Sequence, residues 1–305
     1  MRKSLNVIAT ILVAVIVVGV GMFATSRNTD ETNWGPTPNI LVVTTNITMA
    51  HFVKIVSGDI NVNAGVTPIV SSDIEPHEYE PSTSDVAFAL ENADVFIAVG
   101  SSFDGWAKGI VDERERLGKT NLVVMDWDAA DPHFWLDPIT LSGTIDDIAS
   151  TLALADPEHA AAYAANAAAY QTELAALDAE FRTMLAACDL RDIITTHGAF
   201  GFLAARYDIN DHAVTGISPE DEPTARDLAR LADLMREKGI TTVFVEATET
   251  DDLAKALASE VRASIAAIDT FETERPSKTF ETDTADYLEI MRDNLAALAS
   301  AMVCR

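Results

Sequence analysis

Three histidines that lie far apart in this chain each sit in a short segment rich in proline, aromatic or acidic residues. They are His77 in Pro76-His77-Glu78-Tyr79-Glu80-Pro81, His133 in Pro132-His133-Phe134-Trp135-Leu136-Asp137-Pro138, and His197 in Thr196-His197-Gly198-Ala199-Phe200. Prolines restrict the backbone beside the first two, so an imidazole can be held in place before a ligand arrives. Three neutral imidazoles and one carboxylate make a four-coordinate set suited to Zn²⁺. The same set can bind Mn²⁺ or Fe²⁺ if the carboxylate binds through both oxygens or a water molecule adds a further ligand. The pattern indicates a metal site assembled by folding.

The histidines share a position at the ends of predicted strands. His197 follows the apolar run 193–196, and His77 and His133 also come just after β-branched runs. Ligands of open parallel sheets bind beyond the carboxyl ends of the strands, so two such sheets facing one another would bring the histidines to one cleft. Asp269, at the end of the run 265–268, is our predicted fourth ligand. Glu246 ends another run and is the alternative, either as the ligand or as the acceptor of a histidine N–H.

The other candidate side chains receive less specific roles. Asp137 is expected to cap a helix or to hold a histidine rather than to bind metal. Trp135 either shields the site from water or belongs to the core. The remaining histidines are interpreted as packing or surface residues: His51, His159 and His212.

The elements that must position these residues alternate between two types. Short β-branched runs at 39–45, 66–71, 94–99 and 122–126, and again at 192–196, 213–217, 241–246 and 265–270, are separated by segments with helical spacing. Such alternation predicts mainly parallel sheets with helices on their faces. Between the two sets of runs, the alanine-rich residues 157–187 are predicted to form one helix. A helix of about thirty residues is about 45 Å long. We therefore predict an α/β fold of two lobes, 39–156 and 188–305, joined by one long rigid helix.

The N-terminus carries an export signal. Arg2 and Lys3 precede an apolar run from Leu5 to Ala24, so residues 1–27 are expected to form a signal peptide or an uncleaved anchor, with residues 28–38 as a tether. The rest of the chain should then lie outside the cytoplasm, where disulfides persist. The only two cysteines, Cys188 and Cys304, either pair there or remain two buried thiols.

Charge excludes one class of partner. With 48 acidic and 21 basic residues among 305, the formal net charge is −27, and no basic patch that could neutralise nucleic acid phosphates can be assembled. The negative charge suits a cation as cargo, or it serves solubility alone.

The three histidine segments resemble the motifs of the zinc and manganese substrate-binding proteins of ABC transporters, known as cluster A-I. The segments Asp156-Pro157-Glu158 and Gly216-Ile217-Ser218-Pro219-Glu220 are also similar to that family. The likeness extends from about residue 39 to the C-terminus. It implies two α/β lobes joined by a long helix, with the metal held between the lobes by His77, His133, His197 and Asp269.

The resemblance implies a non-catalytic receptor that captures Zn²⁺ and hands it to an ABC permease, either directly or with a zinc metallochaperone. We expect a monomer that meets the membrane only through its N-terminal segment or the permease. A manganese receptor is the alternative, because residues 101–131 contain no histidine, whereas zinc-specific members of the family often carry a histidine-rich loop after the first histidine motif. A zinc hydrolase is less favoured, because a fourth protein ligand would close the site and the chain has neither an HExxH nor a GxSxG motif.

Overall fold

The computed structural model describes residues 40–58, 65–71, 74–101, 103–218, 223–246, 252–273 and 286–305. The expected signal peptide or anchor and its tether, residues 1–38, lie outside these ranges. Within the ranges, no helix is both long enough and apolar enough to cross a membrane.

The first half of the chain forms a parallel sheet of four strands in the order β2-β1-β3-β4. The strands are β1 (Val42–Thr44), β2 (Val66–Pro68), β3 (Val95–Ala98) and β4 (Thr120–Val123). The two central strands are buried at every residue, which is why they read as continuous apolar runs in the sequence. The predicted strands of this half are confirmed in type, and each is shorter than its run.

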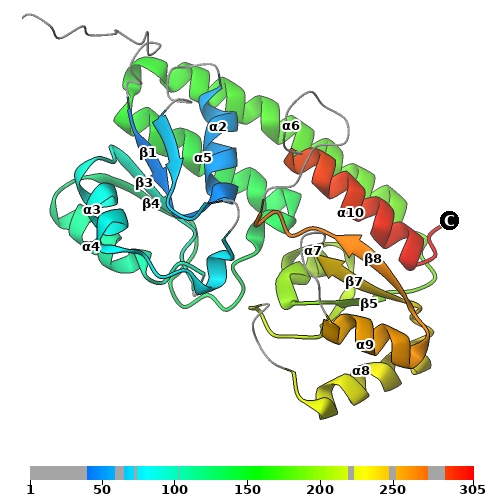
Figure 1. Ribbon diagram of the computed structural model, residues 1–305. Helices are drawn as coiled ribbons and strands as arrows, with labels where there is room; N and C mark the ends of the chain where they lie inside the picture. Colours follow the sequence, from blue (N-terminus) through cyan, green and yellow to red (C-terminus); the bar gives the residue numbers. More distant parts are fainter. Residues whose placement is uncertain are drawn as a thin grey trace, which may run out of the picture. The chain divides into compact units, whose positions relative to one another are not determined.

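Helices cover both faces of this sheet (Figure 1). They are α2 (Ile47–Ser57), α3 (Thr83–Glu91), α4 (Ala107–Arg116) and α5 (Pro138–Ala155). Because side chains alternate along a strand, Val42 joins the core that contains residues of α2 and α5, while its neighbour Val43 joins the cluster that contains residues of α3 and α4. The α/β layering expected from the alternating pattern is therefore present.

The long helix α6 (Ala160–Leu185) follows a 3₁₀ turn at Pro157–His159, close to its predicted bounds. Near its start, Asn166 donates to the carbonyl oxygen of Val56 in α2. Near its end, the ring of Phe181 stacks on that of Tyr207, with 4.9 Å between the centroids. Tyr207 ends α7 (Gly201–Tyr207) in the second half of the chain. One helix thus contacts elements from both halves.

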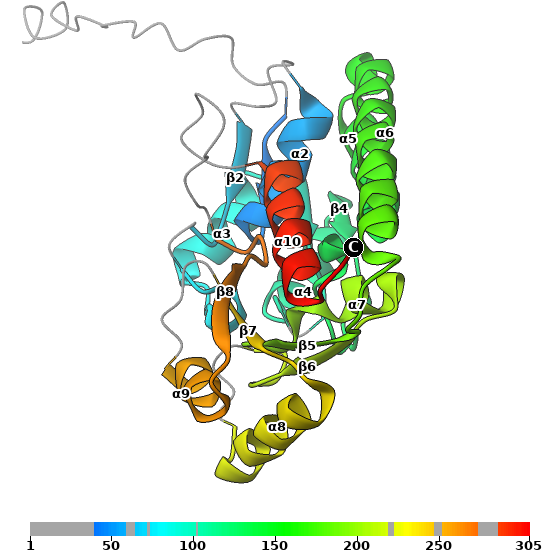
Figure 2. The ribbon, with the colours of Figure 1, turned by 90° about the vertical axis from the view of Figure 1, so that its right-hand side faces the viewer.

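The second half contains two pairs of parallel strands. β5 (Asp192–Thr195) pairs with β6 (Asn210–Ala213), and β7 (Thr242–Glu246) pairs with β8 (Ser264–Ile268). Figures 1 and 2 show α8 (Ala225–Lys238) and α9 (Asp252–Val261) on one side of these strands and α10 (Tyr287–Ala301) on the other. This arrangement again agrees with the predicted α/β class.

One predicted strand, 213–217, is misplaced. The strand β6 lies earlier and consists of the polar residues Asn210, Asp211 and His212 with Ala213. Asp208 adopts the left-handed conformation at the end of α7, with φ of 57°, so the chain turns out of the helix directly into the strand. The polar composition of β6 concealed it, because sequence patterns detect strands mainly through apolar residues.

Cys188 and Cys304 form a disulfide, which decides between the two alternatives left open by the sequence. The bond joins the end of the chain after α10 to the segment after α6. The two cysteines are separated by 116 residues. Closing so long a loop removes conformational freedom mainly from the unfolded chain.

The double substitution Cys188→Ser and Cys304→Ser should therefore lower the free energy of unfolding by about 2–4 kcal/mol. Guanidinium chloride titration of the metal-free protein, followed by circular dichroism, would measure this. A reducing agent should destabilise the parent protein and leave the double variant unchanged. Equal stability of the two proteins would show that the disulfide contributes nothing.

Candidate metal-binding site

Each of the three predicted histidines lies in a short turn that follows a strand. His77 lies in the 3₁₀ turn Pro76–Glu78 after β2, and His133 immediately precedes the 3₁₀ turn Phe134–Leu136 after β4. His197 follows β5 and precedes the 3₁₀ turn Gly198–Phe200. The strand-end placement inferred from the sequence is confirmed.

These turns bring the three imidazoles together. The ring centroids of His77, His133 and His197 lie 5.2 to 5.9 Å apart, and the Nε2 atoms of His77 and His133 are separated by 3.3 Å. One nitrogen of each histidine and a carboxylate oxygen of Glu272 all lie within 4.8 Å of one another. The side chains are 5% exposed or less, so water is largely excluded from the cluster.

The carboxylate of Glu272 completes the group. Its Oε1 lies 2.8 Å from Nε2 of His133 and 3.5 Å from Nε2 of His77, and its Oε2 lies 4.0 Å from Nε2 of His197. A tetrahedral zinc ion with bonds near 2.0 Å holds its donor atoms roughly 3.3 Å apart. The observed separations lie on either side of that value, so this donor set fits a zinc ion with small side-chain adjustments.

Asp269, the predicted fourth ligand, is not part of this group. Its Oδ1 accepts a hydrogen bond of 2.8 Å from the backbone N–H of Phe271, and Asn294 bonds to both its backbone N–H and its carbonyl oxygen. An aspartate that accepts from the residue two positions on forms an Asx turn, a common use of this side chain. The turn redirects the chain so that Glu272, three residues later, reaches the histidines instead.

The segment that carries Glu272 is fastened to the first half of the chain. Trp135 Nε1 donates to the carbonyl oxygen of Thr270, and Thr48 Oγ1 donates to that of Phe271, both at 2.7 Å. Phe271 adopts the left-handed conformation with φ of 62°, which costs about 1–2 kcal/mol for a residue other than glycine. One sequence feature points to Glu272: aspartate at position 269 favours an Asx turn, which redirects the residues that follow it. No sequence feature predicts the left-handed conformation of Phe271.

Two further carboxylates orient the histidines. Asp131 Oδ1 lies 2.8 Å from Nδ1 of His133, and the carboxylate of Glu246 lies against Nδ1 of His197. A carboxylate in this position accepts the Nδ1–H and leaves the lone pair on Nε2, which faces the cluster. The alternative role considered for Glu246, acceptor of a histidine N–H, is therefore the one that the structure favours.

The remaining candidates lie outside the cluster. Asp137 accepts from the N–H of Ile139 at the start of α5 and so caps the helix as expected, while it also binds Arg206. Trp135 is fully buried with its ring centroid 5.4 Å from that of His133, so it both packs in the core and forms a wall of the site. The other histidines have different neighbours: His51 packs on Phe271, His159 contacts Asp156, and His212 contacts Asp192.

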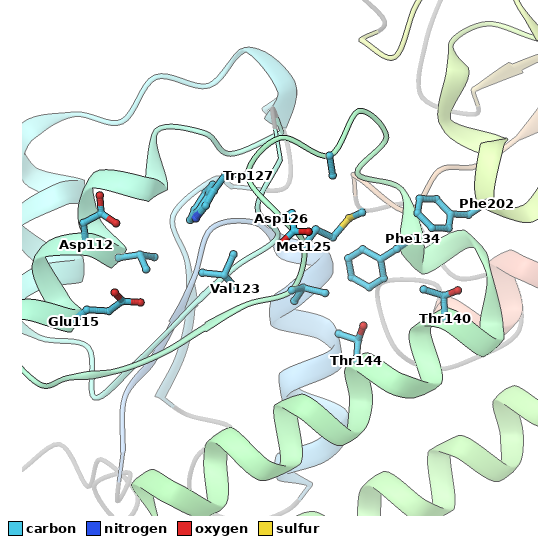
Figure 3. A pocket seen from close by; sticks show the side chains of 13 residues that line it. Asp112, Glu115, Val123, Met125, Asp126, Trp127, Phe134, Thr140, Thr144 and Phe202 are labelled. Atoms are coloured by element: carbon cyan, nitrogen blue, oxygen red, sulfur yellow. The ribbon is translucent and has the colours of Figure 1, made fainter.

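A cavity that Phe134, the neighbour of His133, helps to line is separate from the cluster. It has a volume of about 670 Å³. As Figure 3 shows, Asp112 and Glu115 lie at one end and Phe134 and Phe202 at the other. None of the four clustered side chains lines it. The candidate site is therefore a compact buried cluster and not a part of this cavity.

The charges of the cluster favour protons in the absence of metal. Burial lowers the pKa of His133, but the carboxylates of Glu272 and Asp131 outweigh this effect and raise it to about 9. Burial also lowers the pKa of His197, and contact with Glu246 more than compensates and raises it. Burial alone would raise the pKa of Glu272, yet the histidines hold it well below its ordinary value. A metal ion must displace these protons.

Zn²⁺ binding should consequently release protons. Because its pKa is raised from 6.5 to about 9, His133 keeps a second ring proton between these two pH values, where an ordinary histidine would have lost it. In that pH range about one proton should therefore leave for each ion bound, and the apparent affinity for Zn²⁺ should rise with pH. Calorimetric titrations in two buffers with different ionisation enthalpies would count the protons. A heat that is independent of the buffer would contradict this assignment.

Comparison with known proteins agrees with the geometry. The family model described as ZnuA, zinc-uptake complex component A, periplasmic, matches residues 42–301. The high-affinity zinc uptake system protein ZnuA of Bacillus subtilis is 28% identical over 286 residues, which cover 87% of this chain and 88% of that protein.

Two solved structures are similar to this one. The laminin binding protein Lmb of Streptococcus agalactiae, described as a bifunctional protein with adhesin and metal transporting activity, is 30% identical with a TM-score of 0.75, covering 86% of this chain and 99% of that one. Zn(II)-bound AdcA from Streptococcus pneumoniae is 28% identical with a TM-score of 0.72, covering 86% of this chain and 57% of that one. The chain thus spans little more than half the length of AdcA. Because the family model matches most of the sequence, the chain belongs to the ZnuA family of periplasmic zinc-uptake components.

Proposed function

We propose that this protein is a receptor that captures Zn²⁺ outside the cytoplasm through His77, His133, His197 and Glu272 and delivers the ion to an ABC permease. The observation that carries the proposal is that three imidazoles and one carboxylate converge and that all four side chains are almost completely buried from solvent. Two of the imidazoles are oriented by carboxylates at Nδ1. Nothing else in the described parts of the chain explains why so many ionisable groups are buried together.

The donor types favour zinc over manganese. Three nitrogen donors and one oxygen donor match the tetrahedral preference of Zn²⁺, whereas Mn²⁺ prefers sites that are richer in oxygen. Among the relatives that match most of the chain, one is named for zinc uptake and others for zinc binding. The manganese alternative therefore has less support than it had from the sequence.

A receptor role also suits the coordination better than catalysis does. Catalytic zinc sites keep one position for water or substrate, whereas four protein ligands close the shell. The family is one of uptake components and not of enzymes. His77 and His133 come from the first half of the chain and His197 and Glu272 from the second, so separating the halves would divide the ligand set and release the ion.

The finer features of this function are also part of the proposal. Residues 1–27 would act as a signal peptide or anchor, residues 28–38 as a tether, residues 157–187 as the link between lobes 39–156 and 188–305. The apolar run from Leu5 to Ala24 and the contacts of α6 with both halves support these assignments. We further propose a monomer, and a zinc metallochaperone as an additional partner, because residues 101–131 contain no histidine that could collect metal.

The identity of the fourth ligand can be tested by a matched pair of substitutions. Glu272→Gln removes the only carboxylate of the cluster and should weaken Zn²⁺ binding by more than about 100-fold, beyond the range of about 10–100-fold typical of groups that only support a ligand. Asp269→Asn keeps an oxygen that can accept from Phe271, so it should have a smaller effect. Competition with a chromophoric chelator would measure both affinities. A larger loss for Asp269→Asn would return the role to Asp269.

Metal should stabilise the fold without being required for it. A ligand at 100 times its dissociation constant stabilises by about 2.7 kcal/mol, so the melting temperature should rise by several degrees when Zn²⁺ is in such excess. Protein stripped by a chelator should keep its far-ultraviolet circular dichroism, because a receptor must survive empty. Unfolding on removal of the metal would indicate a structural zinc instead.

A further inference from the structure

The hydroxyl of Thr270 lies between two carboxylates of the site. Its Oγ1 is 3.1 Å from Oε2 of Glu246 and 3.2 Å from Oε2 of Glu272. All three side chains belong to buried residues, and Thr270 is 3% exposed. A hydroxyl has a single proton, so it can donate to only one of the two carboxylates at a time.

The oxygen that Thr270 contacts on Glu272 is the one turned away from two of the histidines. Oε1 faces His133 and His77 at 2.8 and 3.5 Å, whereas Oε2 is 4.0 Å from Nε2 of His197. If Glu272 were to bind a metal ion through both oxygens, Oε2 would have to leave the hydroxyl and turn towards the ion.

We infer that the Thr270 hydroxyl restrains Glu272 to metal binding through one oxygen and thereby favours four-coordinate Zn²⁺ over Mn²⁺. The inference rests on the proposed function, since it concerns the same site. A carboxylate that binds through both oxygens raises the coordination number, which suits Mn²⁺ better than Zn²⁺. Thr270 is a positioning residue in this account, because it acts on the ion through Glu272.

The backbone of Thr270 makes the restraint stiff. Its carbonyl oxygen accepts from Trp135 Nε1 at 2.7 Å, and the preceding residue, Asp269, is bound on both sides of its backbone by Asn294. A β-branched side chain has few rotamers available once its backbone is fixed. The hydroxyl is therefore held where it is and cannot follow a rotating carboxylate.

Glu246 competes with Glu272 for the proton of the Thr270 hydroxyl. Its other oxygen lies against Nδ1 of His197, so this carboxylate already has a partner. Among the described residues, Thr270 is the hydrogen-bond donor found for Glu272 Oε2, since Nε2 of His197 lies farther away, at 4.0 Å. When Oε1 of Glu272 binds an ion, the Thr270 hydroxyl should donate to Oε2 of Glu272 and not to Glu246, because Oε2 of Glu272 then has no other hydrogen-bond partner in the described part of the chain.

The test compares two isosteric substitutions that each remove one threonine hydroxyl. Thr270→Val deletes the hydroxyl beside Glu272. Thr151→Val is the matched control, because Thr151 is a buried threonine of α5 whose hydroxyl donates to the carbonyl oxygen of Asp147, outside the site. Thr270→Ser retains a hydroxyl and should restore the parent behaviour. Two measurements apply to all variants: the visible spectrum of the Co²⁺-loaded protein, and competition titration of Zn²⁺ against Mn²⁺.

We expect Thr270→Val to weaken the intense visible bands of four-coordinate Co²⁺ as the coordination number rises. The ratio of Zn²⁺ to Mn²⁺ affinity should fall by about tenfold, the lower end of the range for groups that support a ligand. Thr151→Val and Thr270→Ser should keep the parent spectrum and ratio. If Thr270→Val fails to fold, as judged by circular dichroism, Thr270→Ala should give the same change, because alanine also lacks the hydroxyl and is smaller.

The outcomes separate this inference from the proposed function. A parent protein that does not bind Zn²⁺ stoichiometrically would overturn the proposed function itself. A parent protein that binds Zn²⁺, together with an unchanged Co²⁺ spectrum and affinity ratio in Thr270→Val, would overturn only the role of Thr270. Equal effects of Thr151→Val and Thr270→Val would also overturn it, because the loss of any buried threonine hydroxyl would then explain the result.

Discussion

The structure depends on the burial of a negative carboxylate, Glu272, among three imidazoles. An isolated carboxylate in such a place would be strongly unfavourable, and it is tolerated only when a positive partner compensates it. Protons on the histidines supply that partner without metal, and a divalent cation supplies it more completely. The preference of the cluster for a bound cation is thus a consequence of how much charge the fold has removed from water.

The rest of the fold can be understood as the means of keeping these groups together. The parallel strands deliver His77, His133 and His197 at their carboxyl ends, and short 3₁₀ turns project the imidazoles. Glu272 arrives from the opposite direction, on a segment held by Trp135 and Thr48. Contacts made by one long helix with both halves, and a disulfide near the C-terminus, limit how far the supporting elements can drift.

The parts of this arrangement that could be predicted from the sequence are those encoded locally. Apolar runs identified most strands, the histidine segments identified three members of the buried cluster, and the absence of glycine identified α6. Glu272, the proposed fourth ligand, could not be found in this way, because its position depends on the left-handed conformation of Phe271. Contacts with residues far along the chain hold that segment, from Thr48 to Phe271 and from Trp135 to Thr270. β6 escaped notice for a related reason, since its polar residues pair through the backbone and carry no apolar signal.

The division of the proposed ligands between the two halves of the chain would let one site bind tightly and still release its cargo. Each half of the chain brings two members of the cluster and a supporting carboxylate, Asp131 for His133 and Glu246 for His197. Either half alone offers too few donors for a closed zinc shell, so affinity exists only while both halves meet. Because the supporting carboxylates would move with their own histidines, opening would leave His133 and His197 each with a partner for its proton. Loss of the ion therefore need not leave an uncompensated charge in either half, and an empty receptor can remain folded.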